Sequence, residues 1–236
     1  MGLRTSEPLA LLTDYDTSTA YAQAFYTLFT NMRFHWESTL SRQEQGETSA
    51  TQVHTVQVTA ASPYSGQATI AANVALVAAQ SGSETILVDA NLRASAIRQC
   101  FGLPLGVGLS DLLEEGDITS QKIATCLQST FVPGLRVLGA GSSSLQSSAL
   151  LLSPHFTQVM VSLRDLLAAS GKPSGVAIFH SAPVLSGVDA SLVGALTDQT
   201  VLAVIMGRTT RVQAKQAQEQ LERAHVKLAG VAMLHP

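Results

Sequence analysis

The sequence predicts an α/β protein with a doubly wound, mostly parallel sheet that carries helices on both faces. Short runs rich in β-branched residues alternate with apolar segments of helical length, which is typical of a parallel sheet covered on both sides. The clearest case is residues 58–73, VTAASPYSGQATIAAN. There a strand ends in small residues and turn formers, and Gly66 then opens a buried helix. This is the layout of a strand, a phosphate-binding loop and a helix.

Residues 1–52 are predicted to precede the α/β domain, which spans residues 53–236. The chain starts with a short mixed leader that ends near Thr17. An amphipathic helix follows, because five large apolar residues recur at spacings of three and four: Tyr21, Phe25, Leu28, Phe29 and Met32. Residues 37–52, ESTLSRQEQGETSATQ, are polar and turn-rich and predict a flexible linker.

Six strands are expected in the domain, with helices between them. The chain has 236 residues, 46% of them hydrophobic, so it can bury one sizeable core. The predicted strands are Thr55–Ala60, Thr85–Asp89, Leu135–Gly139, Gly175–Phe179, Thr200–Met206 and Ala229–Met233.

Composition constrains the partners of the protein and the cellular compartment in which it works. A net charge of −3 and a pI near 6.0 argue against nucleic acid as a partner. Cys100 and Cys126 lie at no metal-ligand spacing, which favours a reducing cytosol. The sequence shows no signal-peptide pattern and no apolar run long enough to span a bilayer. We therefore expect a cytoplasmic protein.

Five segments, in order, carry a resemblance to a known family. They are residues 58–73, then ILVDANLR at 86–93, FGLPLGVGLSDLL at 101–113, FHSAPV at 179–184 and MGRTTR at 206–211. From about Ser18 to Leu234 the chain resembles the cytoplasmic tyrosine autokinases of bacterial capsule and exopolysaccharide export. These kinases belong to the MinD and ParA branch of the P-loop ATPases, so the resemblance implies a P-loop NTPase fold.

The resemblance also implies a nucleotide site that lacks the side chains with which the family binds phosphate and magnesium. The matching phosphate loop covers Tyr64, Ser65, Gly66, Gln67, Ala68 and Thr69. Gln67 stands where the family has the lysine that reaches the phosphates, and Ala68 stands where it has the magnesium-binding hydroxyl. Thr69 comes one residue too late to replace that hydroxyl.

The family's acidic positions are altered as well. Asn91 replaces a metal-site carboxylate, which leaves only Asp89 on that strand. His180 matches the Walker B aspartate and is a poor ligand for Mg²⁺, which prefers oxygen. The family would use ATP and Mg²⁺. For this chain we expect no cofactor, no metal and only vestigial catalytic positions at Asp89, Asn91 and His180.

These residues allow other interpretations. His180 could ligate a metal, yet the other histidines lie at no ligand spacing with it, which favours a packed or solvent-bridged strand-end histidine. Asp89 and Arg93 are either remnants of function or a pair that caps the sheet. Ser181 next to His180 suggests a nucleophile and its base, but neighbouring strand residues point to opposite faces.

The amino-terminal helix departs from the family too. The resembling kinases oligomerise through a helix with the pattern E-x-x-R-x-x-R, whereas residues 23–34 read QAFYTLFTNMRF. An exchange of charges for aromatic residues favours an apolar interface. The predicted partner-binding residues are Gln23, Phe25, Tyr26, Phe29 and Met32. The alternative is that Tyr26 and Phe29 pack against the domain's own sheet.

These observations predict a catalytically inactive relative of the tyrosine autokinase that binds or regulates a partner in polysaccharide export. The expected partner is a Wzz-like polysaccharide chain-length regulator in the membrane, which would bring the chain to the inner face of that membrane, or an active kinase paralogue. A homo-oligomer is a further expectation. The alternatives are a weak nucleotide-binding switch or residual tyrosine kinase or ATPase, and an altered or reconstructed sequence selected only for folding.

Overall fold

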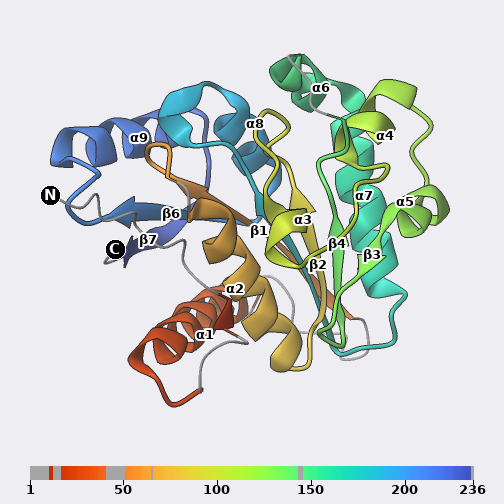
Figure 1. Cartoon of the computed structure of the whole chain (residues 1–236), viewed down its shortest axis with the longest axis horizontal. Helices are drawn as coiled ribbons and strands as arrows, with labels where there is room; N and C mark the ends of the chain where they lie inside the picture. Colours follow the sequence, from red (N-terminus) through yellow and green to blue (C-terminus); the bar gives the residue numbers. More distant parts are fainter. Residues whose placement is uncertain (1–10, 13–16, 41–50, 65, 143–145, 235–236) are drawn as a thin grey trace, which may run out of the picture.

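The computed structural model describes residues 11–12, 17–40, 51–64, 66–142 and 146–234, without the side chains of residues 37–40. It confirms the predicted α/β class (Figure 1). Within the described residues, seven strands form one sheet in the order β3-β4-β2-β5-β1-β6-β7. The strands are β1 Gln52–Ala60, β2 Glu84–Asp89, β3 Gln128–Ser129, β4 Leu135–Leu138, β5 Ser174–His180, β6 Gln199–Ile205 and β7 Leu228–Leu234.

The sheet is parallel except at one edge, where β3 pairs antiparallel with β4. All six predicted strands are present, and their observed ends differ from the predicted ones by at most three residues. The missed strand, β3, has only two residues, too few to show a period of two.

Helices cover both faces of the sheet, as predicted. On one face lie α1, Ala20–Leu40, and α2, Gln67–Gln80, and on the other the longest helix is α7, Pro154–Ala168 (Figure 1). Side chains alternate along β1, so that Val56 and Val58 pack with α2. The remaining helices are α3 Ile97–Cys100, α4 Leu109–Glu115, α5 Ser120–Cys126, α6 Ser147–Leu152, a 3₁₀ turn Val184–Ser186, α8 Asp189–Leu196 and α9 Arg211–Arg223.

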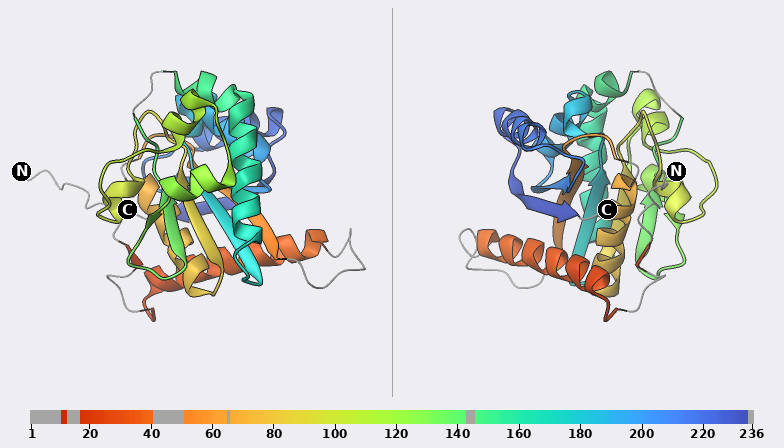
Figure 2. Two further views of the ribbon diagram at one scale, coloured as in Figure 1. Left: turned by 90° about the vertical axis from the view of Figure 1, so that its right-hand side faces the viewer. Right: turned by 60° about the vertical axis from the view of Figure 1, so that its left-hand side comes forward.

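Helix α2 is enclosed, because every residue from Gln67 to Ala79 is buried. A helix that is apolar all round needs cover on its outer side, and α1 supplies it. The Tyr26 hydroxyl donates to Oε1 of Gln80 over 2.7 Å, and Nδ2 of Asn73 donates to the Tyr21 hydroxyl over 2.9 Å. Figure 2 shows α1 lying across the sheet next to α2. The amino-terminal helix therefore shares a core with the central strands.

The predicted linker at 37–52 is wrong at both ends. Residues 37–40 continue α1, and Gln52 is the first residue of β1. Residues 41–50 lie outside the described residues. The helix continues through Trp36, whose ring stacks on His54 with 4.4 Å between the centroids. This contact holds the end of α1 against the start of β1. The division into units 1–52 and 53–236 stays a prediction. No helix within the described ranges has the length and apolar character needed to span a bilayer.

Candidate functional site

The loop after β1 leads into α2 at the carboxyl ends of the central strands. Gly66 precedes the first helical turn and caps it without a side-chain hydrogen bond. Gln67, which stands at the lysine position of the resembling loop, is 4% exposed, and its Nε2 donates to the carbonyl oxygen of Ser181 over 2.6 Å. The Gln67 side chain is therefore engaged within the protein.

The other loop residues offer little to a metal ion. Ala68 is buried and has no polar side-chain atom, and Thr69 is 7% exposed. Tyr64 is half-buried, and the guanidinium carbon of Arg208 lies 5.5 Å from the centre of its ring. Ser65 lies outside the described residues.

Asp89 and His180 form a buried pair at the carboxyl ends of β2 and β5. The two residues are register partners, and Nδ1 of His180 lies 2.9 Å from Oδ1 of Asp89. The His180 side chain is 2% exposed and the Asp89 side chain is 0% exposed. The other carboxylate oxygen accepts hydrogen bonds from the Ser95 hydroxyl and from the amides of Ala96 and Ile97.

These bonds fix the charge of Asp89 and decide which nitrogen of His180 donates to it. Burial by itself would raise the pKa of Asp89, but the hydrogen bond and charge of His180, with the Ile97 amide and the Ser95 hydroxyl, hold it below its ordinary value. The carboxyl group is therefore ionised and can only accept. Nδ1 of His180 must carry the proton of their bond, which leaves Nε2 as the ring nitrogen for other contacts.

The structure does not pair Asp89 with Arg93. Nε of Arg93 instead lies 3.0 Å from a carboxylate oxygen of Asp189, the first residue of α8. Asp189 also accepts from the hydroxyls of Ser147 and Ser148 in α6. Burial would raise the pKa of Asp189, but bonds from Ser148, Arg93 and Ser147 lower it below its ordinary value. Of the two interpretations of Asp89 and Arg93, the pair that caps the sheet is therefore not observed, because Asp89 is bonded to its own loop and to β5.

Ser181 does not act with His180. Its hydroxyl accepts from Nε2 of Gln57 over 2.7 Å and donates to the carbonyl of Ala182. This buried bonding leaves no nucleophile and base pair between Ser181 and His180, as the alternation of strand side chains predicts.

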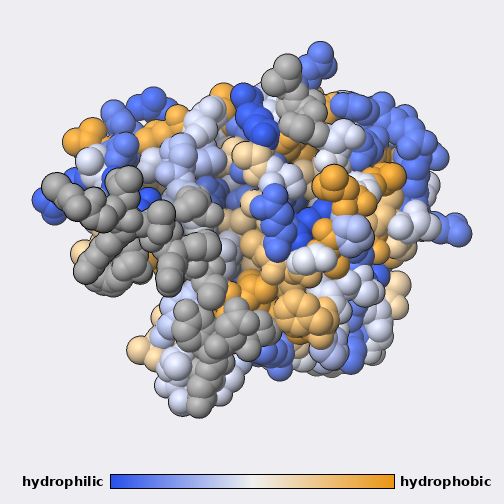
Figure 3. Space-filling model, viewed as in Figure 1, coloured by the Kyte–Doolittle hydropathy of each residue, from blue (hydrophilic) through white to orange (hydrophobic). Residues whose placement is uncertain are grey.

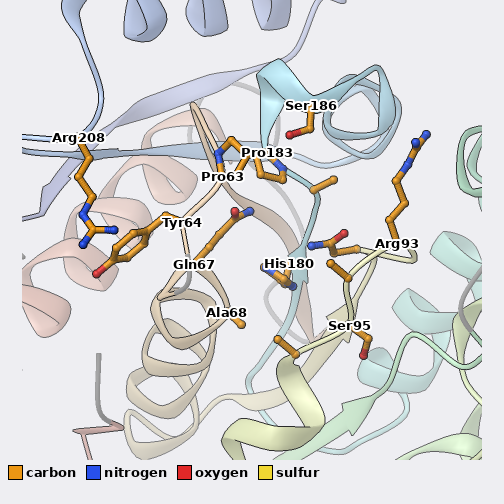
Figure 4. A pocket seen from close by; sticks show the side chains of 14 residues that line it. Pro63, Tyr64, Gln67, Ala68, Arg93, Ser95, His180, Pro183, Ser186 and Arg208 are labelled. Atoms are coloured by element: carbon orange, nitrogen blue, oxygen red, sulfur yellow. The ribbon is translucent and has the colours of Figure 1, made fainter. Parts of the chain in front are cut away.

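A cavity of about 640 Å³ lies over these residues (Figure 4). Gln67 and Ala68 bound it from α2, Asn91 and Arg93 from the segment after β2, and His180 from β5. Arg208 and Tyr64 stand together at one side, and Arg93 stands at the other (Figure 4). Among the described lining residues none is acidic. Hydrophilic and hydrophobic residues are interspersed over the face seen in Figure 3.

The residues present do not fit Mg²⁺. A magnesium site needs oxygen ligands, usually carboxylates, whereas the lining side chains of Ala68 and His180 offer no oxygen and Asn91 offers only a neutral amide oxygen. The nearby carboxylate of Asp89 is 0% exposed and is saturated by its hydrogen bonds. Within the described residues, no group of three or more His, Cys, Asp or Glu side chains is placed to hold a metal ion.

The predicted partner surface on α1 needs correction. Phe25, Phe29 and Met32 are 2–3% exposed and pack in the core shared with α2 and the sheet, so they cannot form an exposed apolar surface. The alternative that Phe29 packs inside the domain is the one observed. Gln23 is exposed, and its Nε2 donates to the carbonyl of Thr17. Tyr26 is half-buried and packs against the same core, so the alternative holds in part for this residue. Their partner role stays a prediction.

Sequence reasoning missed two charged residues of the site. Asp189 follows the loop after β5 and holds Arg93, but no motif marks it. Arg208 lies in the MGRTTR segment, and only the fold shows that it stands beside Tyr64 at the cavity. The placement of Asp189 and Arg208 depends on how the loops after the strands pack together at the carboxyl ends of the strands.

Comparisons with known proteins place the chain in a family, although no family model matches it. It is 31% identical over 182 residues to the tyrosine-protein kinase YwqD of Bacillus subtilis, covering 77% of this chain and 72% of that protein. It is 30% identical over 176 residues to the putative tyrosine-protein kinase EpsB of Ralstonia nicotianae, covering 75% of this chain. That match spans only 22% of EpsB.

Solved structures agree on the fold. The chimerical protein CapA2B2 superposes with a TM-score of 0.77 at 25% identity, over 95% of this chain and 88% of that one. The kinase domain of the Escherichia coli tyrosine kinase ETK gives 0.79 at 22% identity, over 98% and 81%. The septum site-determining protein MinD of Pyrococcus horikoshii, complexed with Mg-ADP, gives 0.59 at 15% identity, over 76% and 69%. The last two show the fold alone, that of the MinD-like P-loop ATPases. By its identity to YwqD across most of both chains, the protein belongs to the bacterial tyrosine-protein kinase family.

Proposed function

We propose that this chain is a catalytically inactive member of the tyrosine-kinase family that serves as a binding or regulatory partner in polysaccharide export. One observation carries the proposal. The two positions that should meet the phosphates and the metal, Gln67 and His180, are bonded to Ser181 and Asp89 instead. Phosphoryl transfer depends on positive charge and metal held against the phosphates, and this arrangement supplies neither in the usual places.

The size of the expected loss supports the same conclusion. Removing one preorganised group that stabilises a transition state costs about 10²- to 10³-fold in rate. Gln67, Ala68, Asn91 and His180 each replace such a group. Even if the losses are far from additive, turnover falls below a useful rate.

The test is a direct assay of the purified protein for ATP hydrolysis and tyrosine autophosphorylation with Mg²⁺. We expect neither above background. Turnover by the unmodified chain that Gln67→Ala abolishes would overturn the proposal and would favour residual kinase or ATPase activity.

A weak nucleotide-binding switch is the second candidate, because the start of α2 borders the cavity and backbone amides there need no side chain to bind phosphate. A titration with Mg-ATP separates the two candidates. The inactive partner predicts no rise in melting temperature, whereas a ligand at about 100 times its dissociation constant adds about 2.7 kcal/mol of stability.

Partner binding is proposed for the accessible part of α1. The relation to kinases of capsule and exopolysaccharide systems makes a Wzz-like membrane regulator or an active kinase paralogue the partner to test. Such a partner would hold the chain at the inner face of the membrane. Tyr26→Arg should weaken capture in a pull-down with either protein, and Val161→Arg on α7, a residue that is 54% exposed, is the control. Equal capture by both variants would exclude this face of α1.

A further inference from the structure

A second groove, of about 820 Å³, lies beside the cavity described above, and we call it the α3 groove. The segment after β2, helix α3, the loop that follows α3, the first turn of α4 and the loop after β4 form its walls. Arg93, Ala94 and Ser95 border both spaces, but neither Gln67 nor His180 lines the α3 groove. It is therefore a separate candidate site, away from the start of α2.

Arg98, the second residue of α3, brings a buried positive charge to this groove. The residue lines the groove and is 4% exposed. Its Nε donates to Oε1 of Gln128 over 3.0 Å, and its Nη2 donates to the carbonyl oxygen of Val107 over 2.8 Å. Both acceptors are neutral, and no carboxylate of the described residues forms an ion pair with Arg98. Buried charges are normally paired, so the counter-ion is missing.

The guanidinium group of Arg98 keeps donors for a ligand. Nη1 makes no hydrogen bond with the described residues, and it is not among the enclosed side-chain atoms that lack a partner. Because Nη1 is neither bonded nor enclosed, it can be reached from outside the protein, and the α3 groove is the opening that Arg98 lines. The unused N–H groups of a guanidinium can only donate, so they call for an acceptor.

The fold holds this guanidinium group in one position. Gly139 follows β4 directly, and a Cβ atom there would overlap with the guanidinium, so glycine leaves the space that the group occupies. Gln128, the acceptor from β3, also donates from its Nε2 to the carbonyl of Pro104 over 3.2 Å. The donors of Arg98 are thus oriented before any ligand arrives, which lowers the entropy that binding costs.

The walls of the groove favour a carboxylate as the ligand. A planar guanidinium matches the two oxygens of a carboxylate. Asp111 also lines the groove, with its two oxygens accepting from the amides of Gly108 and Ser142. A negative side chain at this place repels a doubly charged phosphate more strongly than a singly charged carboxylate.

The rim of the groove favours an apolar group beside that carboxylate. Leu105 is 91% exposed and Val107 is 55% exposed, and both line the groove. A small acid bound within the groove would leave most of Leu105 in water. A peptide segment that continues past the carboxylate can cover it, as the apolar residues at the centre of protein interfaces do.

We propose that the α3 groove docks a segment of a partner protein in which a glutamate or aspartate is flanked by apolar residues. The carboxylate is the counter-ion of Arg98 and accepts from Nη1, and the flanking side chains cover Leu105 and Val107. Charge complementarity selects the occupant, because the groove holds a buried cation without its anion. This goes beyond the proposed function, since it requires neither the loss of catalysis nor the partner role of α1.

Calorimetric titrations of the full chain with capped pentapeptides test the proposal. GLELG carries the glutamate between two leucines, and GLQLG is its neutral counterpart of the same shape. We expect saturable binding of GLELG, weaker by about 10- to 100-fold for GLQLG, which is the loss expected for a hydrogen bond between charged groups. Hexanoate and inorganic phosphate are the other two ligands, and both should bind more weakly than GLELG. Equal binding of the two peptides, or tighter binding of hexanoate or phosphate, overturns the proposal.

Arg98→Met separates a binding role from a structural one. If the charge serves a ligand, the variant should lose affinity for GLELG by about 10- to 100-fold, and its melting temperature should stay the same or rise, because a buried charge without a counter-ion is removed. Arg98→Lys should bind with intermediate affinity, since it keeps the charge but not the planar fork. A lower melting temperature with unchanged affinity would show that Arg98 only bridges Gln128 and Val107.

Leu105→Asp provides a test that does not depend on the core. The residue is exposed, so the variant should fold normally, and a negative charge at the rim should weaken GLELG binding by about tenfold. Val212→Asp on α9 is the matched control, because Val212 is an apolar residue that is 65% exposed and does not line the groove. If Arg98→Met fails to fold, this pair decides, and equal affinities of the two variants contradict the docking site. A protein that binds no peptide but shows no ATP turnover would refute this inference and leave the proposed function standing.

Discussion

Nδ1 of His180 lies 2.9 Å from Oδ1 of Asp89, across the paired ends of β5 and β2. The bond joins two residues that are 91 positions apart in the chain, and both are almost fully enclosed. It stabilises the carboxyl edge of the sheet where the related kinases are expected to hold a metal. The pair therefore explains how the fold satisfies a carboxylate that is buried at the carboxyl ends of the strands.

Asp89→Asn should destabilise the protein by about 3 to 5 kcal/mol, because it removes a buried charge and places an amide N–H₂ group against either His180 or the amides of Ala96 and Ile97. Denaturant unfolding measures the change. Asp117→Asn is the control, since Asp117 is 75% exposed and lies 3.6 Å from Lys122 in a surface ion pair. Such a pair contributes about 0 to 1 kcal/mol. Equal effects of the two variants would refute the role of the buried pair.

Phe29→Ala should cost about 3 to 5 kcal/mol of stability, because the ring is 2% exposed and packs edge-on against Trp36 at 5.8 Å between centroids. Phe34→Ala on the same helix is the matched control. Phe34 is 63% exposed, and its removal should change stability by less than about 0.5 kcal/mol. If Phe29→Ala instead altered only the mass measured by light scattering, the residue would belong to an interface.

Gln67→Lys should not create ATP turnover, since Asn91 and His180 remain. The substitution also removes the bond to the Ser181 carbonyl and places an ammonium group at a position that is 4% exposed. Stability should fall by about 1 to 3 kcal/mol. An ATPase assay and a thermal melt measure the two effects. Gln216→Lys is the control, because Gln216 is an exposed residue of α9. Activity in Gln67→Lys alone would show that the rest of the site is competent.

Stability should fall at acidic pH, and Asp198 should contribute to the fall. Burial would raise its pKa, but the Thr55 amide, Arg164 and the Thr55 hydroxyl hold the pKa below its ordinary value. The unfolded chain therefore binds the proton more readily. The stabilisation is present above the unfolded pKa of about 3.9 and is lost as pH falls through the lower folded value.

Asp198→Asn isolates that contribution. The variant should be less stable than the parent at neutral pH and should lose less stability below about pH 4, because the group that binds the proton is gone. Urea unfolding at a series of pH values measures both slopes. Parallel curves for the two proteins would show that Asp198 does not contribute.

The sequence by itself determined the sheet, the buried helix after Gly66 and the family. These features follow from local signals, because β-branched runs, apolar spacing and short motifs all involve residues that are close together in the sequence. The predicted strands match because buried parallel strands leave little choice of register or face. The sequence also predicts the loss of the lysine and the acidic groups, through Gln67, Ala68, Asn91 and His180.

Only the tertiary structure decided which side chains meet. The helical spacing of Phe25, Phe29 and Met32 marks an apolar face but not what covers it, and the fold turns that face onto the enclosed α2. Arg93 pairs with Asp189, 96 residues away, rather than with nearby Asp89. Charge pairing at a sheet edge depends on strand order and loop packing, because neighbouring strands bring together residues that no local pattern connects.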